Sequence, residues 1–104
     1  MRKITDQAQR AFHNGYYFKQ DNTEVIVEGN ERRLLLHGNC IAKKILGDSL
    51  CLSNGGWTTN TTKERLNGIL SAYANKSIYQ EKFVWYLKQG DKVTEFKYGW
   101  NKID

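Results

Sequence analysis

Four two-residue turn sequences, spaced eight or nine residues apart, constrain the fold of this 104-residue chain more than any other feature. They are Asp21-Asn22, Gly29-Asn30, Gly38-Asn39 and Gly47-Asp48. Glycine, asparagine and aspartate are the residues that tight hairpin turns favour, and the chain contains no proline. The segments between the turns are rich in β-branched, leucine and aromatic residues. The pattern therefore predicts an antiparallel meander of five strands.

A two-residue turn at each of these sites also fixes which residues face each other across the sheet. In that register Phe18 lies opposite Val25, and Val25 lies opposite Leu34. Leu36 lies opposite Ile41, and Ile45 lies opposite Leu50. One face of the sheet collects the apolar residues Tyr16, Phe18, Val25, Val27, Leu34, Leu36, Ile41, Ile45, Leu50 and Leu52. The other face collects Glu24, Arg33, His37, Lys44 and Ser49, with the apolar residues Tyr17, Ile26 and Leu35 among them.

Three features do not suit this register. Glu28 faces Glu31, a like-charge pair that indicates a longer turn between them. Arg32 and Lys43 fall on the apolar face. We expect a β-bulge near Lys43 and Lys44, because one extra residue there would move Lys43 off that face.

The segment Trp57–Tyr73, WTTNTTKERLNGILSAY, predicts the main helix. Thr61 and Glu64 match the capping box that begins a helix, in which each side chain bonds the backbone N–H of the other residue. An apolar stripe follows at helical spacing: Leu66, Ile69, Leu70 and Tyr73. Gly68 costs such a helix about 1 kcal/mol relative to alanine, which indicates that another backbone packs closely there.

The remaining elements are a short helix and a hairpin. Thr5–Asn14 has one apolar face, and Gly15 is placed to end the helix in the left-handed conformation. Phe83–Lys88 and Lys92–Tyr98 predict a final hairpin, with Ser77–Gln80 as a short extra strand. Its register brings together two aromatic pairs, Phe83 with Tyr98 and Trp85 with Phe96. We therefore predict a single α+β domain over residues 1–104: an N-terminal helix, an antiparallel meander, a central helix and a C-terminal hairpin, with both helices on one face of one sheet.

Composition limits the classes of function. The net charge of +5 suits an acidic partner such as nucleic acid. No apolar run is long enough to predict a membrane span, and the N-terminus lacks the apolar segment of a signal peptide. With two cysteines and no export signal, we expect a cytoplasmic protein.

The residues suited to metal binding or nucleophilic catalysis are few. They are His13, His37, Cys40 and Cys51. In the predicted register Cys51 faces Lys44 and lies four residues along the strand from Cys40, roughly 13 Å at about 3.3 Å per residue. That separation excludes a shared metal and a disulfide between the two cysteines. We therefore expect no catalytic residue, no metal and no cofactor.

The start of the main helix carries the residues best suited to nucleic-acid binding. These candidates are Trp57, Thr58, Asn60, Lys63, Arg65 and Asn67. Basic and amide side chains beside free helix N–H groups contact phosphates, and exposed aromatic rings stack on bases. Lys63 and Arg65 also oppose the helix dipole at that end, a small cost that a functional role would explain.

Three segments resemble a family of small, uncharacterised tailed-phage and prophage proteins. His37–Lys44 (HGNCIAKK) and Ser53–Leu70 (SNGGWTTNTTKERLNGIL) match its HGNxIA and GWxTxTTxxRLN patterns, and Gln80–Leu87 (QEKFVWYL) is similar to its closing strand. The resemblance implies a phage gene product that works in the bacterial host cytoplasm. It implies no catalytic residue.

Two hypotheses follow for the function. The first is a small non-catalytic phage accessory protein that binds nucleic acid through the basic, polar start of the main helix. The alternative is a protein-interaction module that acts on a host or phage protein or self-associates, since Tyr17, Ile26 and Leu35 add apolar surface to the polar sheet face. The oligomeric state does not follow from the sequence.

Overall fold

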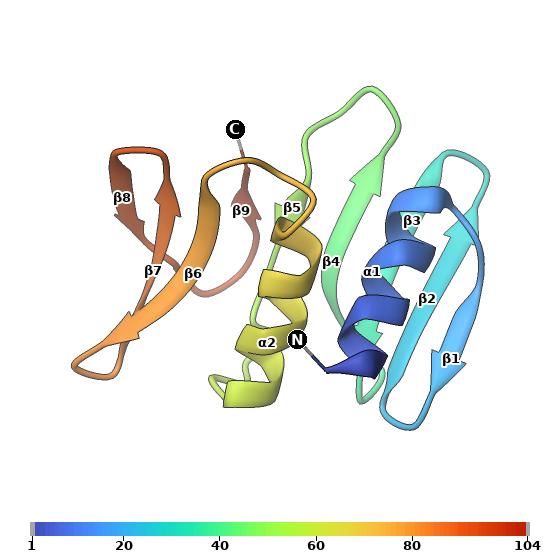
Figure 1. Cartoon of the computed structure of the whole chain (residues 1–104), viewed down its shortest axis with the longest axis horizontal. Helices are drawn as coiled ribbons and strands as arrows, with labels where there is room; N and C mark the ends of the chain where they lie inside the picture. Colours follow the sequence, from blue (N-terminus) through green and yellow to red (C-terminus); the bar gives the residue numbers. More distant parts are fainter. Residues whose placement is uncertain (1, 104) are drawn as a thin grey trace.

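The structure, a computed structural model, describes residues 2–103, and this part of the chain forms two helices and nine strands (Figure 1). The helices are α1 (Lys3–Asn14) and α2 (Asn60–Leu70). The strands are β1 (Phe18–Gln20), β2 (Thr23–Glu28), β3 (Glu31–Leu36), β4 (Asn39–Ile45), β5 (Cys51–Leu52), β6 (Lys76–Glu81), β7 (Val84–Gln89), β8 (Lys92–Glu95) and β9 (Asn101–Lys102). The predicted α+β class is confirmed.

The strands form two antiparallel sheets, so the prediction of a single sheet is wrong. The large sheet has the order β1-β2-β3-β4-β5-β9, and the small sheet has the order β6-β7-β8. The predicted C-terminal hairpin, β7 and β8, pairs with β6 rather than with the meander. β6 is a full six-residue strand that begins after Asn75, whose φ of 60° turns the chain back from α2. Figure 1 shows α2 between the small sheet and the rest of the molecule.

The predicted register is confirmed from β1 to β3. Phe18 pairs with Val25, and Val25 pairs with Leu34. Glu28 pairs with Glu31 across a two-residue turn, so the longer turn expected there is wrong. The like-charge pair is relieved because the guanidinium of Arg33 forms ion pairs with both carboxylates.

The register between β3 and β4 differs from the prediction by two residues next to the turn and by one residue farther along the strands. Leu36 pairs with Asn39 instead of Ile41, because the turn is centred on His37 and Gly38, with φ values of 52° and 79°. Positive φ at both central residues is the geometry that suits a tight hairpin. Ile41 is an extra residue in β4, a β-bulge between Cys40 and Ala42, which pair with Leu35 and Leu34. Its side chain is buried in the core, as predicted.

The predicted position of the bulge, near Lys43 and Lys44, is therefore wrong. The pairing of β4 with β5 also differs from the prediction, because Lys43 rather than Lys44 faces Cys51. Ile45 is consequently not opposite Leu50 and is 48 % exposed. Lys43 leaves the apolar face, as expected, and its Nζ lies 4.2 Å from the ring centroid of Trp100.

Arg32 stays on the helix-covered face and has a specific role there. Its Nη1 donates hydrogen bonds to the backbone oxygens of Phe12 (3.3 Å) and His13 (2.7 Å) in the last turn of α1. A cation at this position satisfies carbonyl groups that have no partner within the helix and complements the helix dipole. Gly15, with φ of 77°, ends α1 as predicted.

The core lies between the two helices and the inner faces of the sheets. The buried apolar residues include Val25, Leu34, Leu36, Ile41, Leu50, Leu52, Leu66, Ile69 and Leu70, which confirms most of the predicted core. Tyr16, predicted to lie on the same face, is 49 % exposed. Gly68 faces Thr5 of α1 so closely that a Cβ atom at residue 68 would lie 2.4 Å from Thr5 Cγ2. The expected close approach at Gly68 is thus an α1–α2 contact.

In the small sheet, one of the two predicted aromatic pairs forms. The backbone N–H of Phe96 donates to the Trp85 carbonyl oxygen at 2.9 Å, and the two ring centroids lie 6.0 Å apart. Phe83 is not a strand residue, because it occupies the β6–β7 turn with φ of 68° and is 93 % exposed. Neither helix in residues 2–103 is long and apolar enough to cross a membrane.

Candidate nucleic-acid interface

Helix α2 begins two residues earlier than the capping-box prediction. Thr59 is the N-cap: its Oγ1 accepts the Thr62 backbone N–H at 3.1 Å and lies 2.9 Å from the Thr62 hydroxyl. The predicted pairing of Thr61 with Glu64 is wrong, because Glu64 Oε1 instead accepts hydrogen bonds from Thr5 and Arg65. Thr61 is therefore free of the capping role and lies half-buried at the helix surface.

Arg65 does not belong to a nucleic-acid interface, which corrects the prediction. Only 3 % of the residue is exposed. Its Nε donates to Thr23 Oγ1 (3.1 Å), and its Nη1 donates to Thr5 Oγ1 (2.6 Å) and Glu64 Oε1 (2.7 Å). Burial lowers the pKa of the guanidinium, and the charge of Glu64 opposes that change. Arg65 thus joins α1, α2 and β2 inside the protein and cannot reach a phosphate.

Asn67 is likewise structural. Its Nδ2 donates to the Ile78 carbonyl oxygen at 2.9 Å, and its Oδ1 accepts the Ile78 backbone N–H at 2.7 Å. The carboxamide therefore fastens β6 to α2. Lys63 remains near the surface, where its Nζ donates to Gln80 Oε1 at 3.2 Å and lies 5.9 Å from the Trp85 ring centroid.

The loop that carries Trp57 is fixed by its own hydrogen bonds. The backbone N–H groups of Gly56 and Trp57 donate to Asn54 Oδ1 (2.8 Å) and the Asn54 carbonyl oxygen (2.9 Å). Gly55 has φ of 65°, and a Cβ atom there would lie 3.3 Å from Ile41 Cγ2, so the loop packs tightly on β4. Trp57 is nevertheless 59 % exposed. A rigid loop thus presents a large apolar ring to solvent.

One side of this loop borders a cavity of about 510 Å³, which we name the Trp57 pocket. Its lining residues come from the β3–β4 turn, the loop and the first turn of α2: Leu36, His37, Ile41, Asn54, Trp57, Thr59, Thr61 and Thr62. The lining is mainly apolar, with hydroxyl, amide and imidazole groups among the polar contributors. The pocket brings together the two sequence segments that carry the HGNxIA and GWxTxTTxxRLN patterns.

The other side of the loop borders a second cavity, of about 230 Å³. It is lined by Asn54, Thr58, Phe83, Val84, Trp85, Glu95, Phe96, Lys97 and Tyr98. Phe83 and Tyr98 are 93 % and 78 % exposed, so their rings border the cavity from outside the core. Asn54 is buried and contributes to the lining of both cavities. Trp57 borders the larger cavity, Phe83 and Tyr98 border the smaller one, and we name these three exposed rings the aromatic surface.

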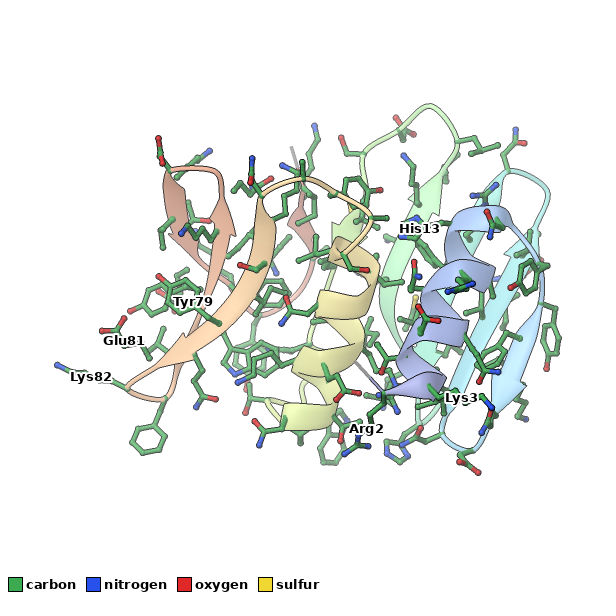
Figure 2. The ribbon with its side chains drawn as sticks, viewed as in Figure 1. Arg2, Lys3, His13, Tyr79, Glu81 and Lys82 are labelled. Atoms are coloured by element: carbon green, nitrogen blue, oxygen red, sulfur yellow. The ribbon has the colours of Figure 1, made fainter. Side chains whose placement is uncertain are left out.

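Basic side chains accompany two of these rings in the sequence. Lys82 precedes Phe83, and Lys97 precedes Tyr98; both lysines are exposed. Figure 2 shows Lys82 at the β6–β7 turn, pointing away from the rest of the molecule. Of the predicted site residues, Trp57 lines the larger cavity, Thr58 lines the smaller one, and Lys63 lies near Trp85 of the smaller one. Asn60 is exposed in the first turn of α2 and lines neither cavity. Sequence reasoning missed Phe83, Lys97 and Tyr98 as site residues, although the repeated lysine–aromatic pair is a signal that could have found them.

The cysteines and histidines do not converge on a common site within residues 2–103. Cys40 and Cys51 are free, and burial raises the pKa of the Cys40 thiol. His13 Nε2 donates to the Ile69 carbonyl oxygen (3.0 Å) between the two helices, whereas His37 lies in the β3–β4 turn. In this described range, no group of three or more His, Cys, Asp or Glu residues is arranged to bind a metal ion.

Comparison with known proteins identifies the family of the chain. The family model described as Kyanoviridae Gp96 protein matches residues 1–102. No curated protein and no solved structure matches the chain. The match extends over almost the whole sequence and agrees with the phage family that the sequence motifs suggested. The chain belongs to the Kyanoviridae Gp96 family of phage proteins.

Proposed function

We propose that this phage protein is a non-catalytic accessory protein that binds single-stranded nucleic acid on the aromatic surface. The observation that carries the proposal is the set of three exposed rings, Trp57, Phe83 and Tyr98, at two cavities that share Asn54 in their lining. Exposed aromatic rings beside basic side chains are the features by which proteins bind single strands, since each ring stacks on a base and each cation contacts the phosphate backbone.

A single strand fits this surface better than a duplex does. The three rings project from a loop, a turn and the segment after β8, so none is presented by a helix or a strand, the elements that read base edges in a major groove. Base faces are accessible to such rings only where the strand is unpaired. Trp57 is presented by a fixed loop, which lowers the entropy cost of binding.

The charges support the same ligand. The net charge is +5, and Lys82 and Lys97, which precede Phe83 and Tyr98 in the sequence, are exposed. Glu95 also lines the smaller cavity and disfavours a phosphate next to it. We therefore assign the backbone contacts to Lys82 and Lys97, with Lys63 near the Trp57 loop as a further cation.

Titration of labelled single-stranded and double-stranded DNA and RNA at several salt concentrations tests the proposal. Trp57→Ala, Phe83→Ala and Tyr98→Ala should each weaken single-strand binding by about 1–3 kcal/mol without changing the salt dependence. Lys82→Ala with Lys97→Ala should flatten the slope of log affinity against log salt by about 1.4, at about 0.7 per phosphate contact.

Tyr17→Ala is the matched control. Tyr17 is 60 % exposed, but it precedes β1 at the opposite end of the large sheet from β9. Its replacement should leave binding unchanged. Absence of binding to every strand at micromolar protein in low salt would refute the proposal, as would equal losses from Tyr17→Ala and Trp57→Ala.

A protein partner is the second candidate, and one observation favours it. Ile26 and Leu35 are half-buried on the face of the large sheet opposite α1 and α2, and Tyr17 adds an exposed ring nearby. The Tyr17 hydroxyl donates to Glu24 Oε2 at 2.9 Å, which fixes the ring over that face. If nucleic acid does not bind, substitution of Ile26 by lysine should instead disrupt a complex recovered from host cells.

A further inference from the structure

We propose that the Trp57 pocket holds one unstacked purine base of the bound strand. This inference rests on the proposed function and assigns a specific subsite within it. The aromatic surface outside the pocket would hold neighbouring nucleotides without regard to their bases. The pocket would raise the affinity for the strand only when a base is present at the nucleotide that enters it.

The pocket has the walls that a base needs. Leu36 and Ile41 are buried core residues that close its inner side, and the exposed ring of Trp57 forms a side wall. The volume of about 510 Å³ leaves room for a two-ring base with part of its sugar. Pockets of several hundred Å³ with apolar walls and a few polar groups are typical of small-molecule sites.

The polar groups of the lining suit the edge of a base. Asn54 Oδ1 accepts the Gly56 N–H at 2.8 Å, which fixes the carboxamide and leaves its NH₂ group to act as a donor. Thr61 is not the helix cap, so its hydroxyl can serve as donor or acceptor. Donors and acceptors of this kind recognise the hydrogen-bonding edges of unpaired bases.

The pocket is also largely preformed. The Ser53 N–H donates to the Ile41 carbonyl oxygen at 2.8 Å, and the His37 N–H donates to the Asn22 carbonyl oxygen at 2.8 Å. These bonds hold the loop on β4 and the β3–β4 turn on Asn22, and both segments contribute to the lining of the cavity. A ring system entering between them needs little rearrangement of the backbone, which favours binding of a flat, rigid group.

A short strand of abasic residues with one central adenine tests the inference, compared with the same strand lacking the adenine. The native protein should bind the adenine-bearing strand about tenfold more tightly, within the range expected for one stacked base. Thr61→Leu should fill the pocket and remove this gain, while affinity for the wholly abasic strand and its salt dependence stay unchanged. Trp57→Ala, from the facing wall, should remove the gain as well.

Asn60→Leu is the matched control, because Asn60 is exposed in the same helical turn and does not line the pocket. It should retain the adenine-dependent gain. A gain that survives Thr61→Leu and Trp57→Ala would overturn the pocket assignment but leave the proposed function intact. Failure of base-containing single strands of any sequence to bind would refute the proposed function itself.

Discussion

Gly68→Ala should destabilise the protein even though alanine is the better helix former. In an isolated helix the substitution would gain about 1 kcal/mol. Here the added Cβ would lie 2.4 Å from Thr5 Cγ2, about 1.1 Å inside the shortest comfortable carbon–carbon separation of about 3.5 Å. The α1–α2 contact must therefore open or Thr5 must rotate.

Thr5 has little freedom to rotate. Its Oγ1 donates to Glu64 Oε1 at 2.7 Å and accepts from Arg65 Nη1 at 2.6 Å, and the residue is 1 % exposed. Overpacking of this kind costs about 1–3 kcal/mol, and the fixed neighbour places the cost near the upper limit. After subtraction of the helix-propensity gain, we expect a net loss of about 2 kcal/mol.

A double-mutant cycle isolates the contact. Thr5→Ser keeps the hydroxyl and removes Cγ2, at a cost of about 1 kcal/mol for the lost methyl group. In that background Gly68→Ala meets only the Thr5 carbonyl oxygen and Cβ at 3.6 and 3.8 Å, so it should stabilise by about 1 kcal/mol. Urea unfolding of all four proteins measures the change of sign. Equal effects of Gly68→Ala in both backgrounds would refute the packing argument.

Three further predictions concern stability. Thr59→Ala should lower the free energy of unfolding by about 1 kcal/mol through loss of the N-cap, while Thr61→Ala should have a much smaller effect; equal urea midpoints for the two variants would contradict the observed helix start. Burial lowers the pKa of His13, and the charges of Arg32 and Lys44 lower it further. As the pH falls below about 6.5, the unfolded chain therefore takes up a proton at His13 more readily than the folded protein does. Stability should therefore decrease from pH 7 to pH 5, and His13→Gln should reduce that slope in urea unfolding measured across this range. Arg65→Met should cost several kcal/mol because it removes the hydrogen bonds that Arg65 donates to Thr5, Thr23 and Glu64 inside the protein; a variant as stable as the native protein would show that these bonds contribute little.

The local sequence was sufficient to predict the strand register wherever a short turn determines it. The Asp21-Asn22 and Gly29-Asn30 turns set the register of β1 to β3, because each offers few alternatives. At the next turn, His37-Gly38 and Gly38-Asn39 are both acceptable centres. The choice of the first depends on a histidine in the left-handed conformation, which local sequence rarely indicates. The bulge at Ile41 then compensates for that choice.

The candidate site was predicted less well because its geometry depends on distant contacts. Arg65 bonds to Thr5 and Thr23, which lie 60 and 42 residues away in the sequence, so helical spacing could not show that it is buried. The threonine-rich start of α2 offers several equivalent N-caps, which explains the choice of Thr61 over Thr59. Phe83 resembles a strand residue until β6 is recognised as the partner that makes it part of a turn.

The bond pair between Asn67 and Ile78 has a consequence for aggregation. An outer strand normally leaves backbone groups free to recruit a strand from another molecule, and such recruitment starts intermolecular sheets. The Asn67 carboxamide occupies both groups of Ile78 and so obstructs addition at β6. A strand of another molecule could then add to the small sheet at its other edge, β8. There the charges of Lys92 and Glu95 discourage such pairing. Replacement of Asn67 by leucine would remove both hydrogen bonds and leave the outer backbone groups of Ile78 free to pair with a strand of another molecule.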